Sequence, residues 1–214
     1  MRILPPGSFT PWWNQATEAQ KRRYSRTIYV DMHHRGFSLE QPLFTDAVAN
    51  CLVVAINRTA STAGTLAHIN ITQSGCCLKA GLDTVGEELE RMAKSLGGRK
   101  SGLEVLLWKG SGFATVGNAF SRGSESDFGA RLGNHHGFGD VIDLMDRKRP
   151  FRPSSSVLFD PITGIVYELS SDEATFVGDH LAPGKNNPVQ NKFNIAITRI
   201  ADRDFPDDLD EFAA

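Results

Sequence analysis

The sequence predicts an α+β fold in which central mixed or antiparallel β-sheets, arranged like a β-sandwich, are flanked by helices. Residues 52–56 and 64–71 are two apolar segments, and the short connection between them favours an antiparallel pair. A hairpin is expected over 156–169, because turn-forming residues separate two short apolar runs. Apolar residues at helical spacing predict an amphipathic helix over 81–96. Together these patterns indicate sheets with at least one helix packed on them.

The helix over 81–96 has the clearest pattern in the chain. The residues of its apolar face, which we expect to pack on a sheet, are Leu82, Val85, Leu89 and Met92. Its opposite face carries charged residues, Glu88 among them, that are expected to face solvent. The pair Gly97-Gly98 is a suitable stop signal.

Weaker patterns predict the remaining elements. In chain order, they are an irregular lead-in with one short helix over 1–25, a strand over 27–30, a turn over 32–36, strands over 103–108 and 193–200 separated by a short helix or strand over 139–145, and a frayed acidic tail over 202–211. We find no convincing linker, and therefore expect a single domain over 1–214.

The composition is that of an ordinary globular protein, with 40% hydrophobic and 22% charged residues among 214. A formal net charge of -2 gives no general attraction to nucleic acid or to anionic membranes. No apolar stretch is long enough to cross a membrane, so no membrane insertion is expected. The N-terminus lacks the apolar core of a Sec signal peptide. We therefore expect a cytoplasmic protein, or one delivered by a specialised secretion system.

The three cysteines are Cys51, Cys76 and Cys77. This number is odd, too small for a disulfide framework, and typical of a reducing compartment. No Cys-x-x-Cys pair is present, so no metal site is expected. No glycine-rich phosphate-binding motif is present either, so no cofactor is expected. We interpret Cys76 and Cys77 as structural or incidental, which leaves Cys51 as the candidate for chemistry.

Thr45, Cys51 and His68 are the candidate catalytic residues. A cysteine attacks as the thiolate, and a histidine within hydrogen-bond reach can take the thiol proton. A third group, here the threonine hydroxyl, can fix the orientation of the imidazole. Taken alone this pattern is weak, because a cysteine in an apolar run is more often a small core residue.

The spacing of these three residues resembles that of the CheD family of chemoreceptor glutamine deamidases. In that family a threonine lies six residues before the nucleophilic cysteine and a histidine seventeen after it, as Thr45 and His68 do here. The similarity extends over roughly residues 42–170. It departs where the family has Gly-Ser before the cysteine, because this chain has Ala49-Asn50. Extensions over 1–41 and 170–214 also lie outside it.

The resemblance implies hydrolysis of a glutamine side-chain amide in a partner protein. Cys51 would be the nucleophile, His68 the base and Thr45 its support, with no cofactor or metal. Deamidase toxins of the cytotoxic necrotizing factor type share this kind of site, so a bacterial effector whose extensions recognise the substrate is also implied. The alternatives are a catalytically inactive protein-interaction module on the same scaffold, and a cysteine peptidase or transglutaminase. The sequence does not indicate an oligomeric state.

Overall fold

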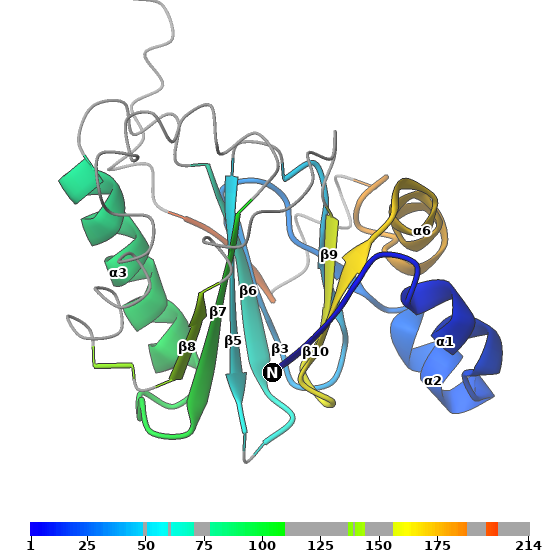
Figure 1. Ribbon diagram of the computed structural model, residues 1–214, viewed down its shortest axis with the longest axis horizontal. Helices are drawn as coiled ribbons and strands as arrows, with labels where there is room; N and C mark the ends of the chain where they lie inside the picture. The colour runs from blue at the N-terminus through cyan, green and yellow to red at the C-terminus, as the bar shows by residue number, and fades with distance from the viewer. Residues whose placement is uncertain are drawn as a thin grey trace, which may run out of the picture.

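The computed structural model describes residues 1–48, 51–59, 61–70, 78–109, 137–138, 140–143, 156–187 and 196–200. These residues form two β-sheets with helices on their outer faces (Figure 1). This arrangement confirms the predicted α+β class.

The first sheet has five strands and mixes parallel with antiparallel pairs. Its strands, in spatial order, are β1 (Arg2–Leu4), β10 (Ile165–Leu169), β9 (Ser156–Asp160), β4 (Leu43–Thr45) and β2 (Ile28–Tyr29). Strands β9 and β10 form the predicted antiparallel hairpin. The outer strands β1 and β2 pair in parallel with β10 and β4, respectively.

The second sheet has six strands. Their spatial order is β11 (Ile197–Arg199), β3 (His34–Ser38), β6 (Gly64–Asn70), β5 (Cys51–Arg58), β7 (Leu103–Lys109) and β8 (Asp140–Asp143). Strands β5 and β6 are antiparallel neighbours, as predicted. The segment expected to be either helix or strand is therefore a strand, β8, which pairs in parallel with β7.

The helices make the outer layers of the molecule. Helix α3 (Leu78–Ser95) lies on the six-stranded sheet, and α1 (Phe9–Gln15), α2 (Glu18–Tyr24) and α6 (Ser171–Phe176) lie on the five-stranded sheet (Figure 1). A short π-helix, η2 (Val177–Leu181), continues α6. One apolar cluster fills the space between the sheets, and one fills the space under each helical layer.

Strand β5 is buried on both faces because it lies in the middle of this stack. Alternate residues starting at Leu52 pack in the cluster under α3, and those starting at Cys51 pack in the cluster between the sheets. This double burial explains why the segment reads as a continuous apolar run. Helix α3 covers the sheet with Val85, Leu89 and Met92 buried, as predicted; the side chain of Leu82 lies outside the described residues.

Two sequence predictions in this region are wrong. Residues 32–36 are not only a turn, because β3 begins at His34. A Cβ atom on Gly36 would lie 2.6 Å from a methyl carbon of Val30, so a close approach that no side-chain pattern reveals holds this strand in place. Glu88 does not face solvent. It is fully buried, and its carboxylate accepts hydrogen bonds at 3.0 and 3.1 Å from Arg35 on β3.

The lead-in is also more ordered than predicted. Residues 1–25 contain a strand and two helices, and the two segments outside the family resemblance pack against each other. The carboxylate of Glu173 accepts hydrogen bonds from the backbone N–H groups of Gly7, Thr10 and Ser170. These bonds lower the pKa of Glu173 although burial alone would raise it.

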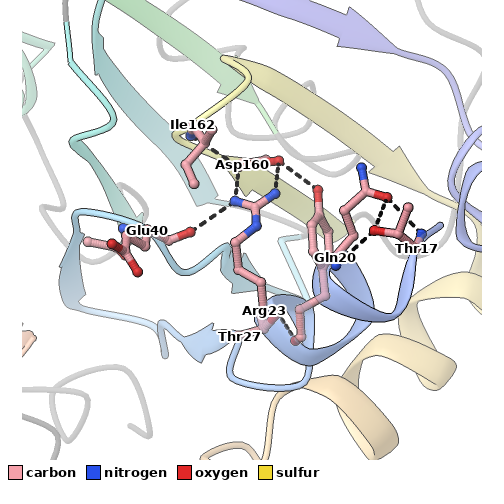
Figure 2. A network of polar contacts seen from close by, with 9 residues as sticks. Thr17, Gln20, Arg23, Thr27, Glu40, Asp160 and Ile162 are labelled. Carbon is pink, nitrogen blue, oxygen red and sulfur yellow. Dashed lines mark hydrogen bonds and ion pairs between the residues drawn. The ribbon is translucent and has the colours of Figure 1, made fainter.

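A largely buried ion pair between Arg23 and Asp160 connects helix α2 to the end of β9, where the turn of the β9–β10 hairpin begins. Figure 2 shows the Arg23 guanidinium facing the carboxylate of Asp160 and the backbone oxygen of Glu40. The two Arg23–Asp160 bonds are 2.7 and 2.6 Å long, and the Tyr24 hydroxyl donates a third bond of 2.8 Å to the same carboxylate. This geometry connects the N-terminal helices to the turn that the sequence predicted.

Candidate active site

Cys51 is the first residue of β5, and its side chain belongs to the apolar cluster between the two sheets. Only 4% of the residue is exposed. The thiol therefore lies at the end of a central strand, at the margin of the core. Catalytic cysteines are usually partly exposed, so the burial of Cys51 is more typical of a structural thiol.

His68 lies on the adjacent strand and on the same face of the sheet. It is the cross-strand partner of Val53 in β5, while Cys51 is the partner of Asn70. Cys51 and His68 are thus diagonal neighbours, a relation in which Cα atoms are typically about 7–8 Å apart and long side chains can meet. The predicted placement on neighbouring antiparallel strands is confirmed.

Thr45 approaches His68 from the other sheet. It ends β4 and is completely buried, and its Oγ1 lies 2.7 Å from His68 Nδ1. This hydrogen bond spans the space between the two sheets, so the packing of one sheet on the other sets the orientation of the imidazole. The structure therefore places Thr45 beside His68 and puts Cys51 and His68 on one sheet face.

The second ring nitrogen of His68, Nε2, differs from Nδ1 in its surroundings. Nε2 is buried and has no hydrogen-bond partner among the described residues. A neutral imidazole has one N–H group and one lone pair. When Nδ1 donates its proton to Thr45, Nε2 carries the lone pair and can act as a base. A buried polar atom without a hydrogen-bond partner is rare in a protein core.

The surroundings keep His68 neutral. The pKa of His68 is lowered to about 4, mainly by burial; the charge of His33 also lowers it, whereas those of Asp31 and Asp46 raise it. The imidazole is thus unprotonated at neutral pH and able to accept a proton.

A short loop before β3 contacts the thiol, a contact that the sequence analysis did not predict. The sulfur of Met32 lies 4.0 Å from the sulfur of Cys51. The next residue, His33, has a φ of 61° and is fixed on both sides of the backbone: its N–H donates to the carbonyl of His68 at 2.8 Å, and its carbonyl accepts from the N–H of Ile200 at 2.8 Å. A methionine after a strand carries no sequence signal for such a position.

A second polar group lies next to Thr45. Asp46 accepts a hydrogen bond of 2.9 Å from the Tyr29 hydroxyl and forms an ion pair of 2.5 Å with Lys185. Burial, together with the neighbouring charge of Asp46, raises the pKa of Tyr29 well above its ordinary value. Lys185 follows η2, so the C-terminal segment reaches the strand that carries Thr45.

Several predicted features lie outside the described residues. They are the departure at Ala49-Asn50 and the cysteines Cys76 and Cys77. Within the described ranges, no group of three or more potential ligand side chains is arranged to hold a metal ion. None of the described helices is both long and apolar enough to cross a membrane. No protein-family model and no curated protein matches the sequence.

Proposed function

We propose that this chain hydrolyses the side-chain amide of a glutamine in a partner protein. The observation that carries the proposal is the 2.7 Å hydrogen bond between Thr45 and His68, with Cys51 on the same sheet face. This arrangement supplies a nucleophile, a neutral base and an orienting hydroxyl at the spacing of the CheD family. The substrate protein would be a bacterial cytoplasmic protein or, for a secreted effector, a host protein.

The chemistry needs only groups of this chain and water. Nε2 of His68 takes the proton of the Cys51 thiol, and the sulfur bonds to the amide carbon. The resulting tetrahedral intermediate collapses as His68 returns the proton to nitrogen, which leaves as ammonia and leaves a thioester on Cys51. His68 then takes a proton from water, the hydroxide attacks the thioester carbon, and the thiol is regenerated with release of glutamate.

The burial of Cys51 and its cover by Met32 favour one alternative, a catalytically inactive interaction module. Alkylation with iodoacetamide separates the two functions. A thiol paired with His68 should react well below pH 8, whereas an inert core thiol should remain unlabelled until the protein unfolds.

Mass spectrometry of candidate partner proteins tests the reaction itself. Each partner is incubated with the wild-type chain or with Cys51→Ser, and peptides are mapped for conversion of glutamine to glutamate. We expect conversion only with the wild type. Backbone cleavage would indicate a peptidase, and amine incorporation a transglutaminase. Equal conversion by wild type and Cys51→Ser would refute the proposed mechanism.

A further inference from the structure

We propose that Met32 is the gate of the active site and a specificity-determining residue, which selects glutamine over the shorter asparagine. This inference rests on the proposed amide hydrolysis for its second part, but not for its first. It starts from the 4.0 Å contact between the sulfur atoms of Met32 and Cys51.

Exposure assigns Met32 to the solvent side of the thiol. Met32 is 42% exposed, whereas Cys51 is 4% exposed. A side chain that contacts a buried thiol and also meets solvent lies on a path by which a reagent or substrate reaches that thiol. Part of the apolar surface of Met32 is therefore in contact with water. A substrate side chain packed on it would remove that surface from water.

The gate is a side chain rather than a moving loop. The backbone around Met32 is held by His33, whose N–H and carbonyl are both bonded to other strands or segments. The Met32 N–H donates to the side chain of Asp31 at 2.8 Å, and its carbonyl lies 2.9 Å from Nδ1 of His34. A methionine side chain has three rotatable bonds and adapts to irregular surfaces. It can therefore swing away from Cys51 while the loop stays in place.

In this position Met32 would favour a long amide side chain. Among the described residues, Met32 is the partly exposed side chain in contact with the thiol, so a carboxamide that enters on this side would place its methylene groups against the thioether. Glutamine has one methylene more than asparagine, and an apolar contact with one methylene is worth about tenfold or more in specificity. Glutamine would thus gain both reach and contact.

The test compares Met32→Ala with Met32→Leu and with the control Ile162→Ala. Ile162 is 41% exposed, nearly the same fraction as Met32. It lies in the turn that follows β9, at the opposite end of this strand from Val157, the residue paired with Thr45. Two quantities are measured on each folded full-length variant. They are the rate of Cys51 alkylation by iodoacetamide, and the ratio of kcat/KM for glutamine and asparagine in otherwise identical peptides.

We expect Met32→Ala to speed alkylation severalfold, to raise KM more than it changes kcat, and to lower the glutamine preference by about tenfold. Met32→Leu should keep most of the preference, and Ile162→Ala should match the wild type in both measurements. Unchanged alkylation in Met32→Ala would overturn the gate, and faster alkylation with an unchanged glutamine preference would overturn the role in specificity. If no peptide is hydrolysed by the wild type but Met32→Ala still speeds alkylation, the gate stands and the proposed function fails.

Discussion

Two buried polar groups near opposite ends of β9 differ in how completely their hydrogen bonds are satisfied. At one end, Asp160 receives two bonds from Arg23, one from Tyr24 and one from the backbone N–H of Ile162. At the other end, beside the strand position of Val157, Thr45 bonds one nitrogen of His68, and the other nitrogen has no partner among the described residues. The first group is complete without a ligand, and the second is not.

Under the proposed function, this difference separates a structural cluster from a reactive one. A buried polar group that is fully bonded holds its neighbours in one geometry, whereas an incomplete one costs stability and persists where function needs it. The charge states agree with this division. Burial alone would raise the pKa of Asp160, but its hydrogen bonds and the charge of Arg23 lower it, so that it is ionised. Burial lowers the pKa of His68 and keeps it neutral. Substitutions at the two ends should therefore affect different properties.

The largest effect is expected from His68→Ala and Cys51→Ser. Each should lower the rate of amide hydrolysis by more than about 10³-fold, because a nucleophile and its base act as a unit. Activity is measured on a partner protein identified by mass spectrometry, and folding by circular dichroism. The fold should survive, since neither residue holds a charged network together. A folded Cys51→Ser protein with substantial activity would remove Cys51 from the mechanism.

Asp160→Asn should have the opposite effect: it should lower the stability of the protein and leave its activity unchanged. Removing one partner of a buried ion pair leaves Arg23 without its counter-charge, at a cost of about 3–5 kcal/mol in the free energy of unfolding. Asp160 is 1% exposed, so water cannot replace the lost charge readily. Urea denaturation measures the loss, and activity per folded molecule should be unchanged. The matched control is Glu18→Gln, which removes an exposed ion pair with Lys21 on the same helix and should change stability little. Equal effects of both variants would contradict the structural role of Asp160.

Local sequence patterns predicted the strands and the helix around the site, but they did not predict the contacts between distant parts of the chain. Alternation and helical periodicity identified β5, β6 and α3, because the buried faces of these elements are set by neighbours close in sequence. The parallel pairing of β1 with β10 and the bond between Lys185 and Asp46 join distant parts of the chain, and no periodicity reports on them. The prediction that Glu88 faces solvent was wrong because its burial depends on an ion pair with Arg35, which lies on strand β3.

The candidate site shows the same limit. The spacing of Thr45, Cys51 and His68 suggested a common site, and the bond between Thr45 and His68 agrees with that expectation. Met32 gave no signal, because what distinguishes it is its place above Cys51 rather than its neighbours in sequence. A side chain that covers a site is found only when the loops are in place.

The pH dependence of stability should also distinguish the two ends. The pKa of His68 is about 4 in the folded protein, whereas the ordinary value expected in the unfolded chain is 6.5. Between pH 4 and pH 6.5 the unfolded chain therefore binds more protons than the folded protein. The contribution of a neutral His68 is complete above about pH 6.5 and is lost as the pH falls toward 4, by about 3 kcal/mol in total. That of Asp160, whose pKa lies below its ordinary 3.8, is lost only at lower pH.

Denaturation of the wild type and His68→Gln between pH 7 and 4 measures the contribution of His68. The stability of His68→Gln should depend less steeply on pH in this window, because glutamine does not titrate. Activity should depend on pH in the same direction, since the base must be unprotonated, with the acid limb near pH 4. Parallel stability curves for the two proteins would show that His68 is not held neutral by burial.

The smallest effect is expected from Thr45→Ala, which removes the hydroxyl that orients the ring of His68. Without this bond the imidazole is free to rotate and is no longer held in one orientation, so the rate should fall by roughly ten- to a hundredfold, in line with other supporting groups. Thr45→Ser keeps the hydroxyl and serves as the control, and it should retain most of the activity. The same pair of variants is compared by alkylation of Cys51 at high pH, where the thiol ionises without help from His68, and both should label at the wild-type rate. A Thr45→Ala protein as active as Thr45→Ser would mean that the 2.7 Å bond is structural only. The Thr45–His68 pair beside Val157 would then resemble the Asp160 cluster more closely than the missing partner of Nε2 suggests.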